Sequence, residues 1–263
     1  MIDFESKHSY DVYDLSRIIA LLRAPGGCPW DIEQTHESIR RNLLEEAYEA
    51  AEAIDEDDAG HLREELGDVL MQVVFHCDIE EKSGRFNLDD TADEACRKLI
   101  RRHPHVFGDV SAATSGEVRY NWDIIKKEEK NHTTVAESMS SVARSLPALW
   151  RAEKIQGKAA KAGVDVAAWA GVPAFNRRAR AEKETGENFS GTAKEALERE
   201  LGALETSIST GTDIEEHLGD LLFSVVNLSR SYDIDPENAL SLASERFIAW
   251  YARLEGETAG EQN

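Results

Sequence analysis

The chain has 263 residues, a formal net charge of −21 at pH 7, and 41% apolar and 31% charged residues, which favours two modest folded domains, or one domain built from a repeat, over a disordered chain. The negative charge repels a phosphate backbone, so we expect no nucleic-acid partner. No apolar run approaches the roughly 18 residues of a membrane span, and the acidic start resembles no targeting signal, so we expect a cytoplasmic protein without a membrane partner.

The spacing of apolar residues predicts an all-α fold. Apolar positions recur at steps of three and four residues, and no segment alternates apolar and polar residues for long. The stretch 132–141 is polar and lacks periodicity, so we expect a linker there. Helices are predicted over residues 10–24, 35–56, 60–82, 89–103, 117–130, 145–162, 192–209, 213–231 and 237–254.

The second part of the chain repeats the first. LGDVL at 66–70 corresponds to LGDLL at 218–222, and a Glu-rich helix precedes each of them. Tandem helical hairpins usually pack as four-helix-bundle assemblies, often completed by a second chain. We therefore expect a catalytic unit over 1–135, a linker and connecting helix over 136–165, and a second unit over 166–263.

Five acids on two neighbouring helices are the candidates for chemistry. Glu45, Glu46 and Glu49 flank the apolar stripe of the first helix, and Glu65 and Asp68 flank that of the second. Antiparallel packing would bring both sets to one edge of a bundle. Carboxylates held together repel one another, and a divalent cation relieves that repulsion. Oxygen ligands favour Mg²⁺, with Mn²⁺ as the alternative, over zinc.

The position of Asp68 and the apolar stripes both bear on how these two helices pack. A Glu-rich helix face is most often only solvated, but Asp68 lies within the very apolar LGDVLMQVVF, where an ordinary surface charge has little room. This run is apolar on nearly every face, which predicts a homodimer, although the second unit of the same chain is another possible cover. The residues expected to face the core are Leu44, Ala47, Tyr48, Ala51 and Ile54 on the first helix, and Leu62, Leu66, Leu70 and Val73 on the second.

Several segments together resemble the MazG family of nucleoside triphosphate pyrophosphohydrolases. They are GGCPWDIEQTHESI at 26–39, EExxE at 45–49, ELGD at 65–68, GRFNLDD at 84–90, RRHPHVFGDV at 101–110 and SLPALWRAEKIQGKAAKAGVD at 145–165. The resemblance implies hydrolysis of NTPs and dNTPs between the α and β phosphates, with release of a nucleoside monophosphate and pyrophosphate, and a role in cleaning the nucleotide pool.

The resemblance also implies roles for single residues. Glu45 would help to hold or activate the attacking water, and the ligands of Mg²⁺ would be Glu46, Glu49, Glu65 and Asp68. Trp122 would cover the nucleotide base, with a plain core anchor as an equal alternative. The phosphates would be bound by Lys98, Arg101, Arg102 and Lys126.

The second unit departs from this pattern. Where EExxE is expected the chain reads Arg199-Glu200-Leu201-Gly202-Ala203, and His217 stands where the ExxD motif should begin. Glu200 and Asp220 alone would make a poor metal site, so we expect this unit to be structural, packing or dimerising through Leu218, Leu221, Leu222, Val225 and Val226. Two rival readings of the whole chain remain, an acidic helical adaptor without catalysis and a narrow dUTPase-like enzyme.

Overall fold

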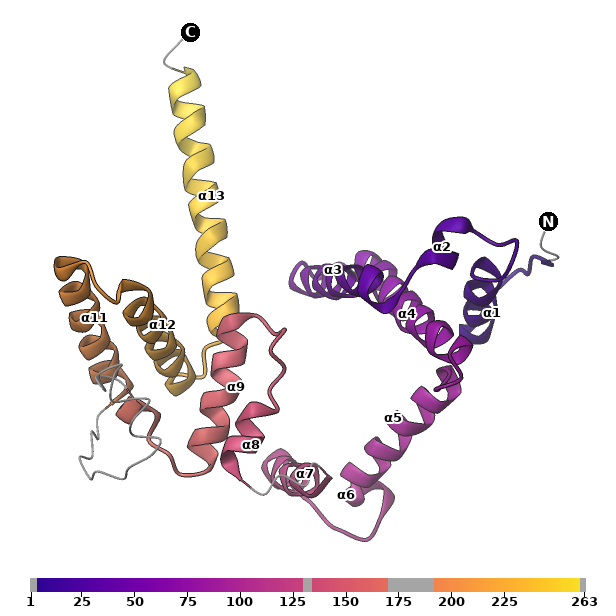
Figure 1. The fold of residues 1–263 in the computed structure, drawn as a ribbon, viewed down its shortest axis with the longest axis horizontal. Helices are drawn as coiled ribbons and strands as arrows, with labels where there is room; N and C mark the ends of the chain where they lie inside the picture. The colour runs from indigo at the N-terminus through magenta and orange to yellow at the C-terminus, as the bar shows by residue number, and fades with distance from the viewer. Residues whose placement is uncertain (1–3, 130–133, 170–191, 261–263) are drawn as a thin grey trace. The chain divides into compact units, whose positions relative to one another are not determined.

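The computed structural model describes residues 4–129, 134–169 and 192–260, and the chain packs as two units, Met1–Glu129 and Lys130–Asn263 (Figure 1). The described residues are helical and contain no strand, which confirms the predicted all-α fold. In this part of the chain, no helix combines the length and the apolar character needed to cross a membrane.

Unit 1 is built around a pair of long helices. The pair is α3 and α4, which share the most extensive contact in the chain and are joined by a short turn. Two short helices that the sequence analysis does not predict, α2 and α6, both begin at a proline, a residue suited to the first turn. The elements are α1 (Val12–Leu22), α2 (Pro29–Glu33), α3 (His36–Asp55), α4 (Ala59–Lys82), α5 (Leu88–Arg102), α6 (Pro104–Phe107) and α7 (Ser115–Glu129).

Aspartates set the turn between α3 and α4. Asp57 has a φ of 56°, a left-handed conformation that Asp tolerates better than most residues. Asp58 then caps α4, and its Oδ1 accepts hydrogen bonds from the backbone N–H groups of Gly60 at 2.9 Å and His61 at 3.1 Å. This tight turn fixes which residues of α3 and α4 face each other.

The prediction that the apolar stripe of α3 faces the core is wrong. Leu44, Ala47, Tyr48, Ala51 and Ile54 are all exposed in the single chain, as are Leu66 and Leu70 of the α4 stripe, whereas Leu62 and Val73 are half-buried. The contact with α4 is made instead on the side of α3 that carries the buried small residues Ala50 and Ala53. Small side chains let two helices approach closely, so the bulkier apolar face is left uncovered by this unit.

The core of unit 1 lies at the other end of α4. Val74 and Phe75 pack there against Ile19 of α1 and Ile39 of α3, and the rim of this cluster is Leu15, Leu22, Met71, Ile79 and Leu88. Much of the apolar run that suggested a partner chain is therefore covered by the chain itself.

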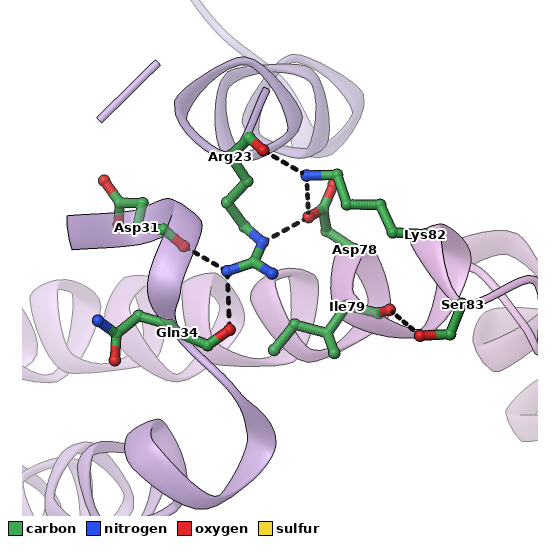
Figure 2. Close-up of polar contacts among 7 residues, drawn as sticks. All are labelled: Arg23, Asp31, Gln34, Asp78, Ile79, Lys82 and Ser83. Atoms are coloured by element: carbon green, nitrogen blue, oxygen red, sulfur yellow. Dashed lines mark hydrogen bonds and ion pairs between the residues drawn. The ribbon is translucent and has the colours of Figure 1, made fainter. Parts of the chain in front are cut away.

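A buried ion pair joins the end of α1 to α4 (Figure 2). Nε of Arg23 lies 2.6 Å from Oδ2 of Asp78, and both side chains are 7% exposed. Nη1 of Arg23 also donates to the carbonyls of Asp31 and Gln34, and Lys82 Nζ donates to both Asp78 Oδ2 and the Arg23 carbonyl. The guanidinium thus holds α1, α2 and the C-terminal half of α4 together.

Unit 2 repeats the long hairpin. Its elements are α8 (Val135–Ser140), α9 (Ala148–Lys161), the 3-10 helix η1 (Val166–Trp169), α11 (Ala193–Thr210), α12 (Ile214–Ser231) and α13 (Pro236–Gly260). Helix α9 is anchored on α12 by the fully buried Gln156, whose Nε2 donates to the carbonyl of Phe223 at 2.7 Å. Of the apolar residues expected to pack or dimerise, Val226 is buried within the unit, Leu221 is half-buried, and Leu218, Leu222 and Val225 are exposed.

The linker expected over 132–141 contains a helix. Within its described part, Val135–Ser140 forms α8, which packs on α9. A capping box explains why so polar a segment is helical: the Thr134 side chain accepts from the N–H of Glu137, and the Glu137 carboxylate accepts from the N–H of Thr134. The boundary between the units correspondingly falls at 129/130, whereas we expected it near 135.

Candidate active site

Three carboxylates converge between α3 and α4. Glu46 and Glu49 on α3 and Glu65 on α4 each place one oxygen within 4.8 Å of the other two. Glu65 is buried, Glu46 is half-buried and Glu49 is exposed, so the group runs from the helix interface out to solvent. The hairpin therefore brings together three of the four predicted metal ligands.

Burial and the neighbouring carboxylates both disfavour the charged form of Glu46. Burial, followed by the charges of Asp68, Glu49 and Glu65, raises the pKa of Glu46 above its usual 4.5. Asp68, the fourth predicted ligand, is half-buried and acts on Glu46 through its charge. Oxygen donors that repel one another suit a hard divalent cation, so the residues present fit the ion that the sequence analysis expects.

His61 and Glu45 lie beside this group without belonging to it. His61, which the sequence analysis missed, lies one turn before Glu65, with its Nε2 3.2 Å from Glu65 Oε1. A histidine four residues before a motif glutamate was the available signal. Glu45, the predicted base, stands outside the group of three: Arg41 Nε lies 2.7 Å from its Oε1, and its side chain is 47% exposed.

The predicted phosphate-binding residues gather on α5 and α7, around a glutamate that the sequence analysis also missed. Glu129 binds Arg102 Nη2 at 2.5 Å, and Arg101 Nε lies 3.9 Å away. The hydrogen bond from Arg102, followed by the charges of Arg102, Arg101 and Lys98, lowers the pKa of Glu129. The Glu129 carboxylate thus holds Arg102 directly and lies close to Arg101.

Trp122 belongs to the same cluster. The Cζ atom of Arg102 lies 5.3 Å from the centroid of its ring, and Nζ of Lys126 lies 4.7 Å from it. These are cation–π distances. The half-buried ring is therefore a platform for two predicted phosphate ligands, a role that neither of the two readings of Trp122 included.

The carboxylate group and the cationic cluster lie on different helix pairs of unit 1. Helix α5 packs on α4 and on α7, and Figure 1 shows it leading away from the α3–α4 pair, with α6 and α7 towards its C-terminal end. A polyphosphate that contacted both sets would bind a metal ion held by the carboxylate group with some of its oxygens. Its other oxygens would bind the arginine and lysine side chains of the cationic cluster.

Comparisons with known proteins find one family model and several relatives that match this chain. A family model described as the MazG nucleotide pyrophosphohydrolase domain matches residues 34–107, a span that contains the whole α3–α4 hairpin and α5. The nucleoside triphosphate pyrophosphohydrolase/pyrophosphatase MazG of Thermotoga maritima is 39% identical over 242 residues, which are 92% of this chain and 84% of that protein.

Two further relatives cover most of the chain. The nucleoside triphosphate pyrophosphohydrolase of Escherichia coli K12 is 38% identical over 243 residues, 92% of this chain and 86% of that protein. The Bacillus subtilis protein YabN is 41% identical over 259 residues, 98% of this chain. The matched region is only 49% of YabN, so the chain spans about half the length of that relative.

Proposed function

Because this chain belongs to the MazG nucleotide pyrophosphohydrolase family, we propose that its first unit hydrolyses NTPs and dNTPs between the α and β phosphates. The products would be a nucleoside monophosphate and pyrophosphate, and the role would be removal of unwanted nucleotides from the pool. The observation that carries the proposal is the convergence of Glu46, Glu49 and Glu65 on the hairpin that the family model matches.

The donor set supports Mg²⁺ as the cofactor, with Mn²⁺ as the alternative. Glu46, Glu49, Glu65 and Asp68 would hold it, because carboxylate oxygens are the ligands that these ions prefer. When bound, the ion would make a coordinated water more acidic and neutralise charge on the phosphates. Its charge would also offset the burial and the repulsion that together raise the pKa of Glu46.

The hydrolysis needs a proton acceptor beside the attacking water. The water oxygen bonds to the α phosphorus, the bond from that phosphorus to the bridging oxygen breaks, and pyrophosphate leaves. Glu45 is the candidate to take the proton from the water. Its ion pair with Arg41 spans one exposed helix turn, and such pairs contribute only about 0.3–0.5 kcal/mol, so the carboxylate is released at little cost.

The cationic cluster would bind the phosphates of the substrate. Lys98 and Arg101 have exposed side chains, whereas Arg102 is held against Glu129 and the Trp122 ring. Arginine presents a planar fork that matches phosphate oxygens. Trp122 would cover the base with its remaining aromatic surface and, with Lys126, complete the substrate site.

The uncovered face of the α3–α4 hairpin supports a homodimer. Leu44, Tyr48 and Ile54 on α3 are 40%, 50% and 61% exposed, and Leu66 and Leu70 on α4 are 53% and 40% exposed. An added Cβ at Gly67 would meet nothing within 4 Å, so this face has room for a close neighbour. Apolar side chains gathered on one helical pair are typical of a protein–protein contact.

A substrate panel tests the reaction. The full chain with Mg²⁺ is given the common NTPs and dNTPs and several damaged ones, and pyrophosphate release is scored against orthophosphate release. We expect pyrophosphate from several bases. Hydrolysis of dUTP alone would support the narrow enzyme, orthophosphate alone would contradict cleavage between the α and β phosphates, and no release would favour the adaptor.

Variants test the site. Glu49→Ala and Asp68→Ala should each abolish turnover without lowering the melting temperature of the metal-free protein, because removal of a like charge relieves repulsion. The matched control is Glu52→Ala, which removes an exposed carboxylate from the next turn of α3 and should leave turnover unchanged. A large loss of thermal stability in the first two variants would make those residues structural instead.

A further inference from the structure

The α11–α12 hairpin of unit 2 gathers three metal-ligating side chains of two chemical kinds. Glu200 on α11 and His217 and Asp220 on α12 each place one ligand atom within 4.8 Å of the other two. From the sequence, only the two acids Glu200 and Asp220 are expected there, and two acids alone predict a poor metal site. The fold adds the imidazole to them.

The repeat explains why a histidine lies there. His217 precedes Leu-Gly-Asp as Glu65 does in unit 1, and Glu200 stands in the motif where Glu46 stands. Because both hairpins pack in the same way, these corresponding positions converge in both units. The second hairpin therefore keeps two positions of the first group, with a nitrogen ligand in place of the Glu65 carboxylate. Ala203 stands where Glu49 does, and the third member is instead Asp220, the counterpart of Asp68.

The imidazole of His217 is mostly shielded from solvent, with its side chain 19% exposed. Glu200 is fully buried, and Nδ1 of His217 is shielded from solvent and makes no hydrogen bond within the described residues. Nδ1 lies 3.9 Å from Oε2 of Glu200, which is too long for a hydrogen bond. Two ligands of one zinc-like ion, each about 2.0–2.2 Å from it, are separated by roughly 3–4 Å.

The surroundings favour a cation. Arg199, which stands where Glu45 stands in unit 1, donates through Nη2 to the Ala167 carbonyl at 2.9 Å and is thereby tied to η1. Asp220 also lines a shallow surface depression, which gives an ion a route in from solvent. The other residues lining it are Asp213, Ile214, Glu215, Glu216 and Gly219, so its charged side chains are all acidic and attract cations.

We propose that Glu200, His217 and Asp220 form a second divalent-metal site, selective for an imidazole-accepting transition-metal ion of the Zn²⁺ or Co²⁺ class over Mg²⁺. Imidazole nitrogen suits such ions, whereas Mg²⁺ prefers oxygen ligands in an octahedral shell. The site goes beyond the proposed hydrolysis and takes no part in it. Its ion joins α11 to α12, so binding stabilises unit 2.

Co²⁺ is the probe, because its visible absorption reports on nitrogen ligation. The full chain carrying Glu49→Gln and Glu65→Gln, which disables the first group, is titrated with Co²⁺ by calorimetry and absorption. We expect one equivalent to bind and millimolar Mg²⁺ not to displace it. No binding in this background would overturn the proposal of a second metal site. It would not bear on the proposed hydrolysis, because this experiment does not measure turnover.

Second-unit variants in the same background then assign the ligands. His217→Gln and Glu200→Gln should each weaken Co²⁺ binding by more than the roughly 10–100-fold seen for residues that only support a ligand. Glu205→Gln, at an exposed carboxylate of α11, is the matched control and should bind as the background does. Unchanged binding by folded His217→Gln, judged by circular dichroism, would contradict the assignment.

A ligand swap separates ligation from folding. His217→Glu restores the residue type found at Glu65, so it should shift the preference of the site from Co²⁺ towards Mg²⁺ and Mn²⁺. The ratio of Co²⁺ to Mg²⁺ affinity is measured in the same background. An unchanged ratio would overturn the proposal even if His217→Gln failed to fold.

Discussion

Two half-buried histidines of unit 1, His36 and His76, contact each other through their ring nitrogens. The rings of His36 and His76 stack with centroids 5.0 Å apart, and their Nδ1 atoms are 2.7 Å apart, so both cannot carry a proton there. Burial, followed by the charge of His36, lowers the pKa of His76 below its usual 6.5. Glu80 binds both His36 and Arg85; the hydrogen bond from Arg85, outweighing burial and aided by that from His36, lowers the pKa of Glu80 to about 2.

This pair makes stability depend on pH. A histidine whose pKa is lower in the folded than in the unfolded state contributes stability that is full above pH 6.5 and is lost as the pH falls through the folded-state pKa. We expect the melting temperature to decline as the pH falls from 6.5 towards the folded-state pKa, and His76→Gln to flatten the decline. Thermal melts between roughly pH 5 and 8 measure it. The depressed pKa of Glu80 acts at lower pH, because its contribution is lost only between 4.5 and about 2.

His8→Gln is the control for that profile, because His8 is an exposed histidine outside the pair. It should keep the pH dependence of the parent. A parent profile that is flat below pH 6.5, or a His76→Gln profile that keeps the full decline, would mean that the contact between the histidines does not control stability.

The ion pair of Arg23 and Asp78 differs in burial from the surface pairs. Asp78→Asn would leave the Arg23 guanidinium, whose side chain is 7% exposed, without its carboxylate. Loss of one partner of a buried pair costs about 3–5 kcal/mol, so the free energy of unfolding should fall by that amount. Asp93→Asn is the control: it breaks a pair with Arg97 in which both side chains are more than half exposed, and it should cost less than about 1 kcal/mol. Chemical denaturation measures both, and equal losses would show that burial does not set the strength of these pairs.

At the scale of the helix, the sequence predicts where a helix forms better than which of its faces is buried. The recurrence that predicts α3 and α4 is a local property, and both helices form within one residue of the expected bounds. An apolar face covered by a partner has the same spacing as one covered by its own chain, so periodicity could not tell Leu44 and Tyr48, which are exposed, from Ala50, which is buried.

The contacts of the candidate sites also fall into two kinds, those that motif spacing predicts and those that only tertiary packing creates. Motif spacing predicted that Glu46, Glu49 and Glu65 meet, because each hairpin position is fixed by its helix and a short turn. Glu129 was missed because it reaches Arg102 across 27 residues and two helices, a contact that only tertiary packing creates. His217 was visible as a departure from a motif, but its value as a ligand depends on the atoms that surround it.

The exposed face of the α3–α4 hairpin leads to a prediction about assembly. We expect the parent to be a dimer at micromolar concentration by light scattering, and Ile54→Lys together with Leu70→Lys to make it monomeric, because each places a charge in the buried contact. Leu99→Lys, at a residue of α5 that is 56% exposed, is the matched control and should stay dimeric. A monomeric parent would contradict the homodimer. Burial of this apolar face by the chain's own second unit would then be the alternative.

At the scale of the whole molecule, the two repeated hairpins differ in their potential metal-ligating side chains rather than in their helix pairing. Both contain a long hairpin with a group of potential ligands at its centre, but unit 1 has three carboxylates there and unit 2 has two with a histidine. Unit 1 also carries the cluster of Arg101, Arg102 and Lys126 around Trp122 and Glu129. Hydrolysis of a nucleoside triphosphate needs charge stabilisation at several phosphate oxygens, which this richer set would supply.

This asymmetry predicts that catalysis resides in unit 1 alone. Asp68→Ala should abolish pyrophosphate release in the presence of Mg²⁺ as the only divalent ion. Glu200→Ala combined with Asp220→Ala should leave the turnover of the folded protein within roughly twofold of the parent, because changes in separate units act independently. The two variants are compared in the full chain at equal concentrations of folded protein. If the double variant were inactive and Asp68→Ala active, unit 2 would hold the catalytic site, and the carboxylates of α3 and α4 would have another role.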